Sequence, residues 1–315
     1  MKLRCVVFGA DGFDLDVAFN LMAFYEQLGY STVLSRELIP TDLLVIHRPP
    51  NSPLNLEAYG SVHVWDYVGT SIESLLPNLA AHPNVTIFAS SGARTSALVE
   101  LAPALEGRIH ELLPPVATEL WELPIRETRY NSVHIGNFKP SYAAGKDAPS
   151  SEFLHVIERN RIDVWGAKWP LNSDLDHGPA RLHEVSKIYG QSSYALGMMY
   201  PFQREITLSG RFWHAPLNGC LLFTERSIFS QEVPGVKETD YTSWLTSPPL
   251  GRVAQARLQR KAHEYWHGRF VSAQIEVKAL IAREPSPLNL PKATGGQWVR
   301  EMVRSRAMQV KHLHR

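Results

Sequence analysis

The stretch REITLSGRFWHAPLNGCLLFTE, residues 204–225, decides which fold the sequence predicts. Its last part, residues 220–224, is a short apolar run of the kind that forms a strand buried on both faces of a parallel sheet. Ahead of that run, Ser209 has the residue type of a helix N-cap, and Asn218 and Gly219 tolerate the left-handed conformation that ends a helix. The stretch therefore predicts a short helix that leads directly into a core strand.

The start of that helix has the features of an anion site. Free backbone N–H groups at a helix N-terminus favour an anion by about 0.3–1 kcal/mol, and a charge-assisted hydrogen bond from Arg204 or Arg211 would add about 1.5–3 kcal/mol. Arginines near a helix start are also often solvated or paired with a carboxylate, and Glu205 directly follows Arg204. Both interpretations are open at this point.

The composition is that of a globular enzyme made and kept inside a cell. The chain has 315 residues, enough for two domains, with 44% hydrophobic and 20% charged residues, which excludes a disordered or fibrous protein. Its formal net charge of +1 gives no global field that would recruit nucleic acid, so no nucleic-acid partner is expected. Cys5 and Cys220 lie in apolar runs and indicate buried thiols in a reducing cytoplasm. No membrane span or signal peptide is expected either.

Strand-like and helical segments alternate through the first half of the chain. Residues 15–28 carry apolar side chains at intervals of three and four, and Gly29 suits the end of that helix. The expected strands are residues 3–8, 31–34, 43–47, 61–66 and 84–88. This alternation predicts an open, mostly parallel sheet with right-handed crossovers, which is a Rossmann-like domain.

His47, Asp11, Asp14 and Asp66 stand at the carboxyl ends of expected strands, where such sheets bind ligands. Asp14 is better explained as a helix N-cap. We single out Asp11 and Asp66 as candidates for a general base because neither has so obvious a local role. Gly9 and Gly12 lack the third glycine of a dinucleotide fingerprint, and a tight turn explains them.

The second half repeats the alternation after residues 107–129, which indicate a connection between domains. Its expected strands are residues 130–137, 162–166, 193–200 and 220–224, with helices at 151–160 and 182–189. The predicted fold class is α/β, with two Rossmann-like domains that face a central cleft. Domain ranges of 1–128 and 129–290 are expected. Residues 291–315 should form a basic helix that packs back on the first domain, contacts anionic lipid or presents a solvated face.

The second half resembles the donor-binding half of the GT-B glycosyltransferases, most of all the CgeB-like, spore-maturation-type branch. The resemblance covers residues 130–224, and the first half is similar only in layout. The segments that carry it are VHIGN at 133–137, IDVWG at 162–166, the helix at 184–189 and SGRFWHAPLNGCLL at 209–222. It implies a hexosyltransferase-type enzyme of polysaccharide or glycoconjugate biosynthesis. Such an enzyme moves a sugar from a nucleotide-sugar donor to a glycan, lipid-linked or small-molecule acceptor.

The resemblance also implies where the donor binds. In the family, the glycine-ended first strand of the second domain approaches the diphosphate, which maps onto Gly136, Asn137 and Lys139. In the family, the strand before the segment that corresponds to residues 204–225 helps to form the nucleoside pocket, which maps loosely onto Tyr200.

The segment before the small-residue turn holds the diphosphate and sugar in the family, and it maps onto Ser209, Gly210 and Arg211. The family usually has a glutamate in the next turn, whereas this chain has His214. A neutral imidazole can bond a hydroxyl or a phosphate, but it cannot act as a carboxylate.

No cofactor or metal is expected beside the nucleotide sugar. Without a metal, backbone N–H groups and cations must meet the negative charge that grows on the departing diphosphate, and Arg211, Arg204 and Lys139 suit that role. A base in the first domain, Asp66 or Asp11, would take the proton of the acceptor hydroxyl.

Other interpretations stay open. His214 in place of the glutamate also suits an inert sugar-nucleotide or glycan-binding protein of the same fold. A sugar-nucleotide epimerase is a third class, and only a transferase needs a second substrate. The D-x-D sequence at Asp174 and Asp176 could bind a divalent ion in another transferase fold, but its loop composition is that of a turn.

Overall fold

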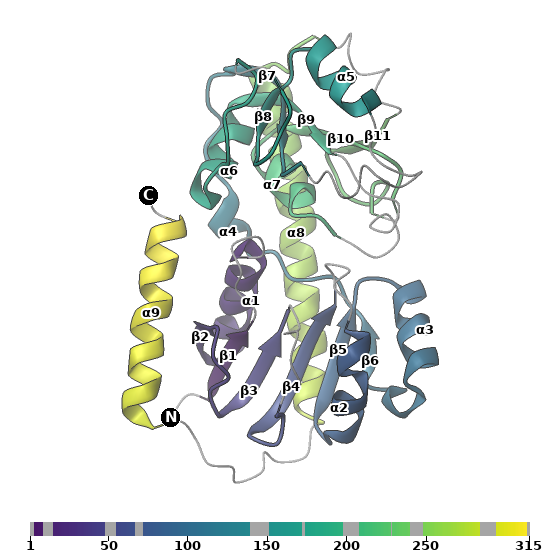
Figure 1. Cartoon of the computed structure of the whole chain (residues 1–315), viewed down its shortest axis with the longest axis vertical. Coiled ribbons are helices and arrows are strands. Elements are labelled where there is room, and N and C mark those ends of the chain that lie inside the picture. Colours follow the sequence, from purple (N-terminus) through teal and green to yellow (C-terminus); the bar gives the residue numbers. More distant parts are fainter. Residues whose placement is uncertain are drawn as a thin grey trace. The chain divides into compact units, whose positions relative to one another are not determined.

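The structure is a computed structural model that describes residues 3–8, 15–47, 55–66, 72–138, 151–171, 174–197, 208–227, 229–239, 248–283 and 294–313. By its internal contacts the chain divides into two compact units. Unit 1 consists mainly of Met1–Ala117 and His267–Arg315, and unit 2 of Thr118–Glu205 and Ser209–Trp266. Each unit has its own parallel sheet with helices around it (Figure 1). The predicted α/β class with two such domains is confirmed, while the domain ranges stay predictions.

Unit 1 contains a six-stranded parallel sheet in the order β2-β1-β3-β4-β5-β6. In its register, Val6 lies opposite Val33 on one side and Leu44 on the other. The elements are β1 (Arg4–Phe8), α1 (Leu15–Gln27), β2 (Ser31–Ser35), β3 (Thr41–Ile46), β4 (Tyr59–Asp66), η1 (Glu73–Leu75), α2 (Leu76–Ala81), β5 (Val85–Ala89), α3 (Gly92–Leu101), η2 (Pro103–Leu105) and β6 (Ile109–Glu111). The predicted connection at residues 107–129 contains the boundary between the units, at Ala117 and Thr118, but it also contains the strand β6, which the sequence did not indicate. Three residues are too few to show a strand's alternation.

Helices bury both faces of the sheet in unit 1, as its continuous apolar strands require. On one face Val6 and Ile87 belong to a cluster that includes Leu79 of α2 and Leu98 of α3. The long helix α8 (Arg252–Ile281) contributes residues to both units, and its part in unit 1 helps to cover the other face. There Phe24 of α1 makes edge contacts with Trp65 and Phe270. The predicted burial of Cys5 and Cys220 as free thiols is confirmed.

The last helix, α9 (Gly295–Leu313), covers the edge strand β2 of unit 1 (Figure 1). Ser305 Oγ accepts the backbone N–H of Leu34 at 2.9 Å, and Ser35 Oγ donates to Glu301 Oε2 at 3.2 Å. Trp298 joins the core cluster of the sheet. An edge strand with free backbone groups is a template for unwanted pairing, and α9 satisfies one such group directly. No helix in the described part of the chain is long and apolar enough to cross a membrane.

Unit 2 contains a five-stranded parallel sheet in the order β11-β10-β9-β7-β8. Its core on one face includes Phe153, Val164 and Leu196. The elements are α4 (Thr118–Trp121), β7 (Tyr130–Ile135), α5 (Ser151–Arg159), β8 (Asp163–Trp165), α6 (Leu182–Gly190), β9 (Ser192–Gly197), α7 (Arg211–Leu217), β10 (Leu221–Thr224) and β11 (Val236–Glu238). The sequence predicts the strands of this sheet except β11, which has three residues and one apolar side chain.

Residues 208–225, the described part of the stretch 204–225, form a helix and a strand as predicted, with one correction at the start of the helix. Gly210, and not Ser209, occupies the N-cap position of α7, with a helical backbone of φ −52° and ψ −24°. The backbone carbonyl of Ser209 instead accepts the N–H of Phe212 at 2.9 Å, so the chain is already turning there. Gly219 ends the helix with a φ of +73°, and β10 follows.

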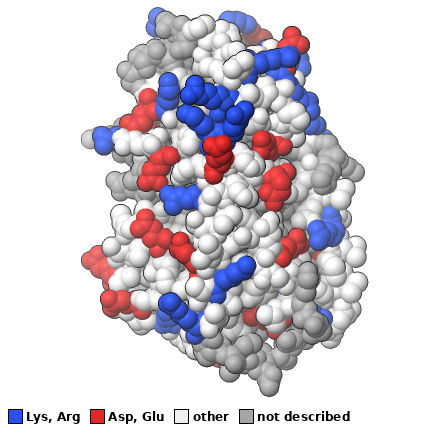
Figure 2. All heavy atoms as spheres, turned by 180° about the vertical axis from the view of Figure 1, so that it is seen from behind, with Lys and Arg blue, Asp and Glu red and all other residues white. Residues whose placement is uncertain are grey.

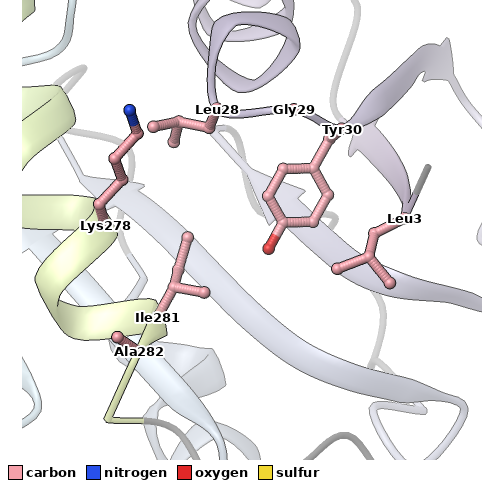
Figure 3. A pocket seen from close by; sticks show the side chains of 7 residues that line it. All are labelled: Leu3, Leu28, Gly29, Tyr30, Lys278, Ile281 and Ala282. Atoms are coloured by element: carbon pink, nitrogen blue, oxygen red, sulfur yellow. The ribbon is translucent and has the colours of Figure 1, made fainter.

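A pocket of about 240 Å³ lies at the amino edge of the sheet in unit 1 (Figure 3). Its lining residues are Leu3, Leu28, Gly29, Tyr30, Lys278, Ile281 and Ala282. Because Leu3 and Tyr30 directly precede β1 and β2, the pocket is at the opposite end of the strands from Asp66. None of the described residues among those predicted for donor binding or catalysis lines this pocket.

Candidate functional site

The strand order of unit 2 creates a topological switch point between β7 and β9. Within the sheet, β8 pairs with one edge of β7. The chain then returns, and β9 pairs with the other edge of β7. In open parallel sheets, ligands bind outside the carboxyl ends of the strands at such a point. Gly136 directly follows β7, and Gly197 ends β9. The groups around Gly136 therefore form the candidate site.

Arg211 reaches from the start of α7 to the end of β7. Its Nε donates a hydrogen bond to the carbonyl oxygen of Ile135 at 2.7 Å. A Cβ atom at position 136 would lie 2.2 Å from Arg211 Nη2, so only glycine leaves room for the guanidinium. This bond fixes the direction of the guanidinium at the carboxyl end of β7. This arrangement suits the binding of an anion.

The loops after β7 and β8 are locked together beside Arg211. Trp169 Nε1 donates to the carbonyl oxygen of Gly136 at 2.6 Å, and Asn137 Oδ1 accepts the N–H of Ala167 at 2.8 Å. A Cβ atom on Gly166 would lie 1.9 Å from that same Gly136 oxygen. The backbone at Gly166 therefore packs directly against the turn after β7, and this contact fixes the position of the turn.

His134 adds a neutral hydrogen-bond acceptor to this group. It lies on the same face of β7 as Gly136, because side chains alternate along a strand. Its Nδ1 lies 2.8 Å from the carbonyl oxygen of Leu196, and since a carbonyl can only accept, Nδ1 carries the proton. Nε2 is then an acceptor that lies 3.1 Å from the Cβ position of residue 136, without a hydrogen-bond partner among the described residues. Burial, with a smaller contribution from Arg211, lowers the pKa of His134 to about 3.

The remaining donor-site predictions are placed less centrally. Ser209 and Gly210 adjoin Arg211 and are partly exposed. The ring of His214 is buried and packs against Trp121 at 4.7 Å and Trp213 at 5.7 Å between centroids. The structure therefore brings Gly136, Asn137 and Arg211 together and turns His214 toward tryptophans. Lys139, Tyr200, Arg204 and the candidate base Asp11 lie outside the described residues.

Asp66, at the end of β4 in unit 1, is bound to an arginine. Its Oδ2 accepts Arg94 Nε at 2.6 Å, and Arg94 Nη1 donates to Glu73 Oε1 at 2.9 Å. Only 1% of the Asp66 side chain is exposed. Burial raises the pKa of the Asp66 carboxyl, and the Arg94 guanidinium opposes that rise. Asp66 therefore has a structural partner that the sequence did not indicate, and its role as a base stays a prediction.

The aspartates of the D-x-D sequence make local contacts. Asp174 Oδ2 pairs with Arg161 Nη2 at 2.6 Å, with both side chains largely exposed. Asp176 Oδ1 accepts the N–H of Gly178 at 2.9 Å, which is the turn contact that the loop composition predicted. In the part of the chain that the structure describes, no group of three or more His, Cys, Asp or Glu side chains could hold a metal ion.

Sequence reasoning did not assign His134 and Trp169 to the site. The spacing of His134 and Gly136 contained a signal, since residues two apart on a strand share a face. The sequence contains no such signal for Trp169, because the contact of Trp169 with Gly136 depends on the path of the loop after β8. In that loop Lys168 has a φ of +69°, a left-handed conformation that costs a non-glycine residue about 1–2 kcal/mol. Such strain often marks a functional site.

Charge on the back face of the molecule is mixed rather than uniform. Figure 2 shows one compact group of Lys and Arg side chains in its upper half, with acidic side chains directly beside it. Elsewhere on this face, basic and acidic side chains are interspersed. This agrees with the formal net charge of +1 and means that no field of a single sign covers this face.

Solved structures resemble this chain, although no family model and no curated protein matches it. An α-glucosyltransferase in complex with UDP and a 13-mer DNA is 12% identical, with a TM-score of 0.56, over 88% of this chain and 100% of that one. AviGT4, a glycosyltransferase involved in avilamycin A biosynthesis, is 13% identical, with a TM-score of 0.54, over 90% and 98%. HepE of Anabaena, solved with UDP and glucose, is 9% identical, with a TM-score of 0.53, over 89% and 100%. At these identities the likeness concerns the fold, which is that of the GT-B glycosyltransferases.

Proposed function

We propose that this protein is a glycosyltransferase of the GT-B fold, related to the CgeB-like branch, that uses a nucleotide-sugar donor without a metal. The acceptor is a glycan, a lipid-linked or a small molecule. The observation that supports this most is the guanidinium of Arg211, fixed over Gly136 at the switch point of unit 2. The α-glucosyltransferase and HepE were both solved with UDP, which supports a nucleotide at a site of this kind.

Each group at the switch point has a role in this proposal. The donor diphosphate lies against Arg211 and the backbone after β7, where Gly136 allows close approach. As the sugar leaves, negative charge grows on the diphosphate, and a cation already held in place stabilises that charge without reorganisation. Asn137 and Trp169 keep the turn rigid, because they hold the backbone on either side of it. Ser209 and Gly210 line the approach to Arg211.

His134 would support the site from behind Gly136, because its side chain is buried and its Nε2 faces the Cβ position of residue 136. Its pKa of about 3 keeps the ring neutral at every physiological pH.

The proton of the acceptor hydroxyl requires a base, and Asp66 and Asp11 are the proposed candidates. If Asp66 is the base, Asp66→Asn should cut transfer by roughly 10²–10⁴-fold and leave nucleotide binding intact. Its melting temperature must be compared with that of the wild type, because the substitution also alters the pair with Arg94. Full activity in a folded variant would move the assignment to Asp11 or to a retaining mechanism.

A thermal-shift panel tests the donor site directly. UDP, GDP, TDP, ADP and CMP are added with and without Mg²⁺, and a ligand at 100 times its Kd should stabilise the protein by about 2.7 kcal/mol. A shift with one nucleotide that is independent of Mg²⁺ would support the proposal and identify the base. Arg211→Ala should weaken that binding by about 1.5–3 kcal/mol, whereas Arg257→Ala, at an exposed position of α8, should not. Equal affinity in both variants would remove Arg211 from the site.

A catalytically inert sugar-nucleotide-binding protein is the second candidate. The packing of His214 against Trp121 favours it, because a buried ring occupies the turn where the resemblance has a carboxylate. Nucleotide binding without transfer to any acceptor and without hydrolysis of the sugar nucleotide would support this candidate. An epimerase would instead convert the sugar nucleotide without a second substrate.

A further inference from the structure

Three valines form a stripe on the solvent side of α9. Val299, Val303 and Val310 have exposed fractions of 53%, 64% and 57%. Their spacing of four and seven residues places them on one side of a helix with 3.6 residues per turn. Valine is a weaker helix former than Ala, Glu or Lys, which usually fill exposed helix positions. The stripe is thus not explained by the stability of the helix.

Cations accompany the valines along the same surface. A basic residue directly follows each valine, and these residues, Arg300, Arg304 and Lys311, form a second exposed row beside the stripe. Arg306 is seven residues after Val299 and four before Val310, so it lies within the stripe, and its Nη2 is 3.4 Å from Oε1 of Glu26 in α1. Residues 295–313 contain these four cations and one carboxylate, Glu301, which gives a formal charge of +3. The whole chain carries only +1, so its remaining residues sum to −2.

The opposite side of α9 is fixed to unit 1, which keeps the valines outward. Trp298, Glu301 and Ser305 are buried, and the last two bond to β2. Glu301 Oε1 also accepts Arg304 Nη1 at 2.6 Å. The exposed surface therefore keeps a defined orientation, with its apolar and basic rows side by side.

We infer that this valine–cation face of α9, formed by Val299, Val303, Val310, Arg300, Arg304, Arg306 and Lys311, binds the surface of an anionic lipid bilayer. The valines lie at the boundary of headgroups and acyl chains, and the cations contact lipid phosphates. Charge complementarity favours this occupant, because each Lys or Arg near an anionic surface raises the binding constant roughly fivefold. A second copy of the chain would set one +3 helix against another, which is unfavourable.

Flotation with lipid vesicles tests this inference in the full-length protein. The wild type should bind vesicles of phosphatidylglycerol and phosphatidylcholine, bind vesicles of phosphatidylcholine alone far less, and lose affinity as salt is raised. A triple variant, Val299→Ser with Val303→Ser and Val310→Ser, should bind at least about tenfold more weakly.

A charge variant and two matched controls complete the test. Arg300→Glu with Lys311→Glu should bind at least about 30-fold more weakly. Val253→Ser changes another exposed valine on a helix, and Arg257→Glu with Arg260→Glu reverses two exposed cations of α8. Both controls should bind as the wild type does. All these positions are exposed, so thermal unfolding should give the same melting temperature in each variant.

Three results would overturn the inference. The first is a wild type that does not bind the anionic vesicles at low salt. The second is a valine variant that binds as well as the wild type, since the contact would then be electrostatic only. The third is a dimer, detected by light scattering, that the valine variant abolishes while vesicle binding is absent, because the face would then join two copies.

Discussion

Arg94 in unit 1 and Arg211 in unit 2 both lie at the carboxyl edge of a parallel sheet, but they are held in different ways. Two carboxylates, those of Asp66 and Glu73, hold Arg94. A backbone carbonyl, that of Ile135, holds Arg211 through Nε. The two carboxylates neutralise Arg94 inside unit 1, whereas the bond to Ile135 directs the Arg211 guanidinium toward Gly136 at the switch point of unit 2. We therefore expect the loss of Arg94 to reduce stability and the loss of Arg211 to reduce nucleotide binding.

The largest expected effect concerns the structural arginine. Arg94→Ala leaves the buried Asp66 carboxylate without its partner, and we expect the free energy of unfolding to fall by about 3–5 kcal/mol. Urea denaturation of the purified variant measures this loss. Arg161→Ala is the matched control, because it breaks an exposed pair with Asp174 and should cost less than about 1 kcal/mol. If both variants lose the same free energy of unfolding, Arg94 is no more important to stability than an exposed arginine.

The second effect is the response of unit 2 to acid. An unfolded histidine titrates near 6.5 and His134 in the folded protein near 3, so between these values the unfolded chain binds more protons. Folding stability therefore falls as the pH falls, by roughly 2–3 kcal/mol between about pH 6 and pH 4. His134→Gln should remove that part of the loss in urea denaturation at the two pH values. His155→Gln, at an exposed position of α5, should not change it.

The third effect tests whether Arg211 must lie over a glycine. Gly136→Ala puts a Cβ atom 2.2 Å from Arg211 Nη2 and displaces the guanidinium. We expect the affinity for the nucleotide identified by thermal shift to fall by about 1–3 kcal/mol, measured by calorimetry. Gly190→Ala is the control in the same unit, because its Cβ would be 3.9 Å from the nearest atom. Unchanged affinity in Gly136→Ala would contradict the proposed site.

The smallest effect concerns the loop that supports this site. Asn137→Ala removes the bond to the N–H of Ala167, which should lower the free energy of unfolding by about 1 kcal/mol and weaken nucleotide binding slightly. Asn160→Ala removes a bond within its own helix turn, to the carbonyl of Val156. It should leave nucleotide binding unchanged. Equal binding in both variants would show that the loop contact does not support the site.

The sequence predicts the long strands because their apolar runs are continuous. The five residues of β1 and the five of β5 are nearly all buried. The short strands β6 and β11, with the sequences IHE and VKE, carry no such pattern. They join the sheets because a neighbouring strand offers an edge, which is a tertiary effect.

The candidate site was predictable only where it is local in sequence. Gly136 and Asn137 follow a strand, and Arg211 precedes a helix, so motif and resemblance indicate them. The contact of Trp169 with Gly136 joins residues 33 apart, and that of Arg94 with Asp66 joins residues 28 apart. Contacts between residues so far apart depend on the tertiary fold and leave no periodic pattern in a single sequence.

The helix over β2 also affects the order in which the chain can be completed during synthesis. Unit 1 combines the first 117 residues with His267–Arg315, whereas the segments of unit 2 lie between them. A ribosome therefore releases β2 long before α9 exists, and the N–H of Leu34 must wait for Ser305, 271 residues later. During that interval the edge of the nascent sheet is open to pairing with other chains. Release of the last helix ends that exposure, so a premature stop near residue 295 would be most harmful to the first half of the protein.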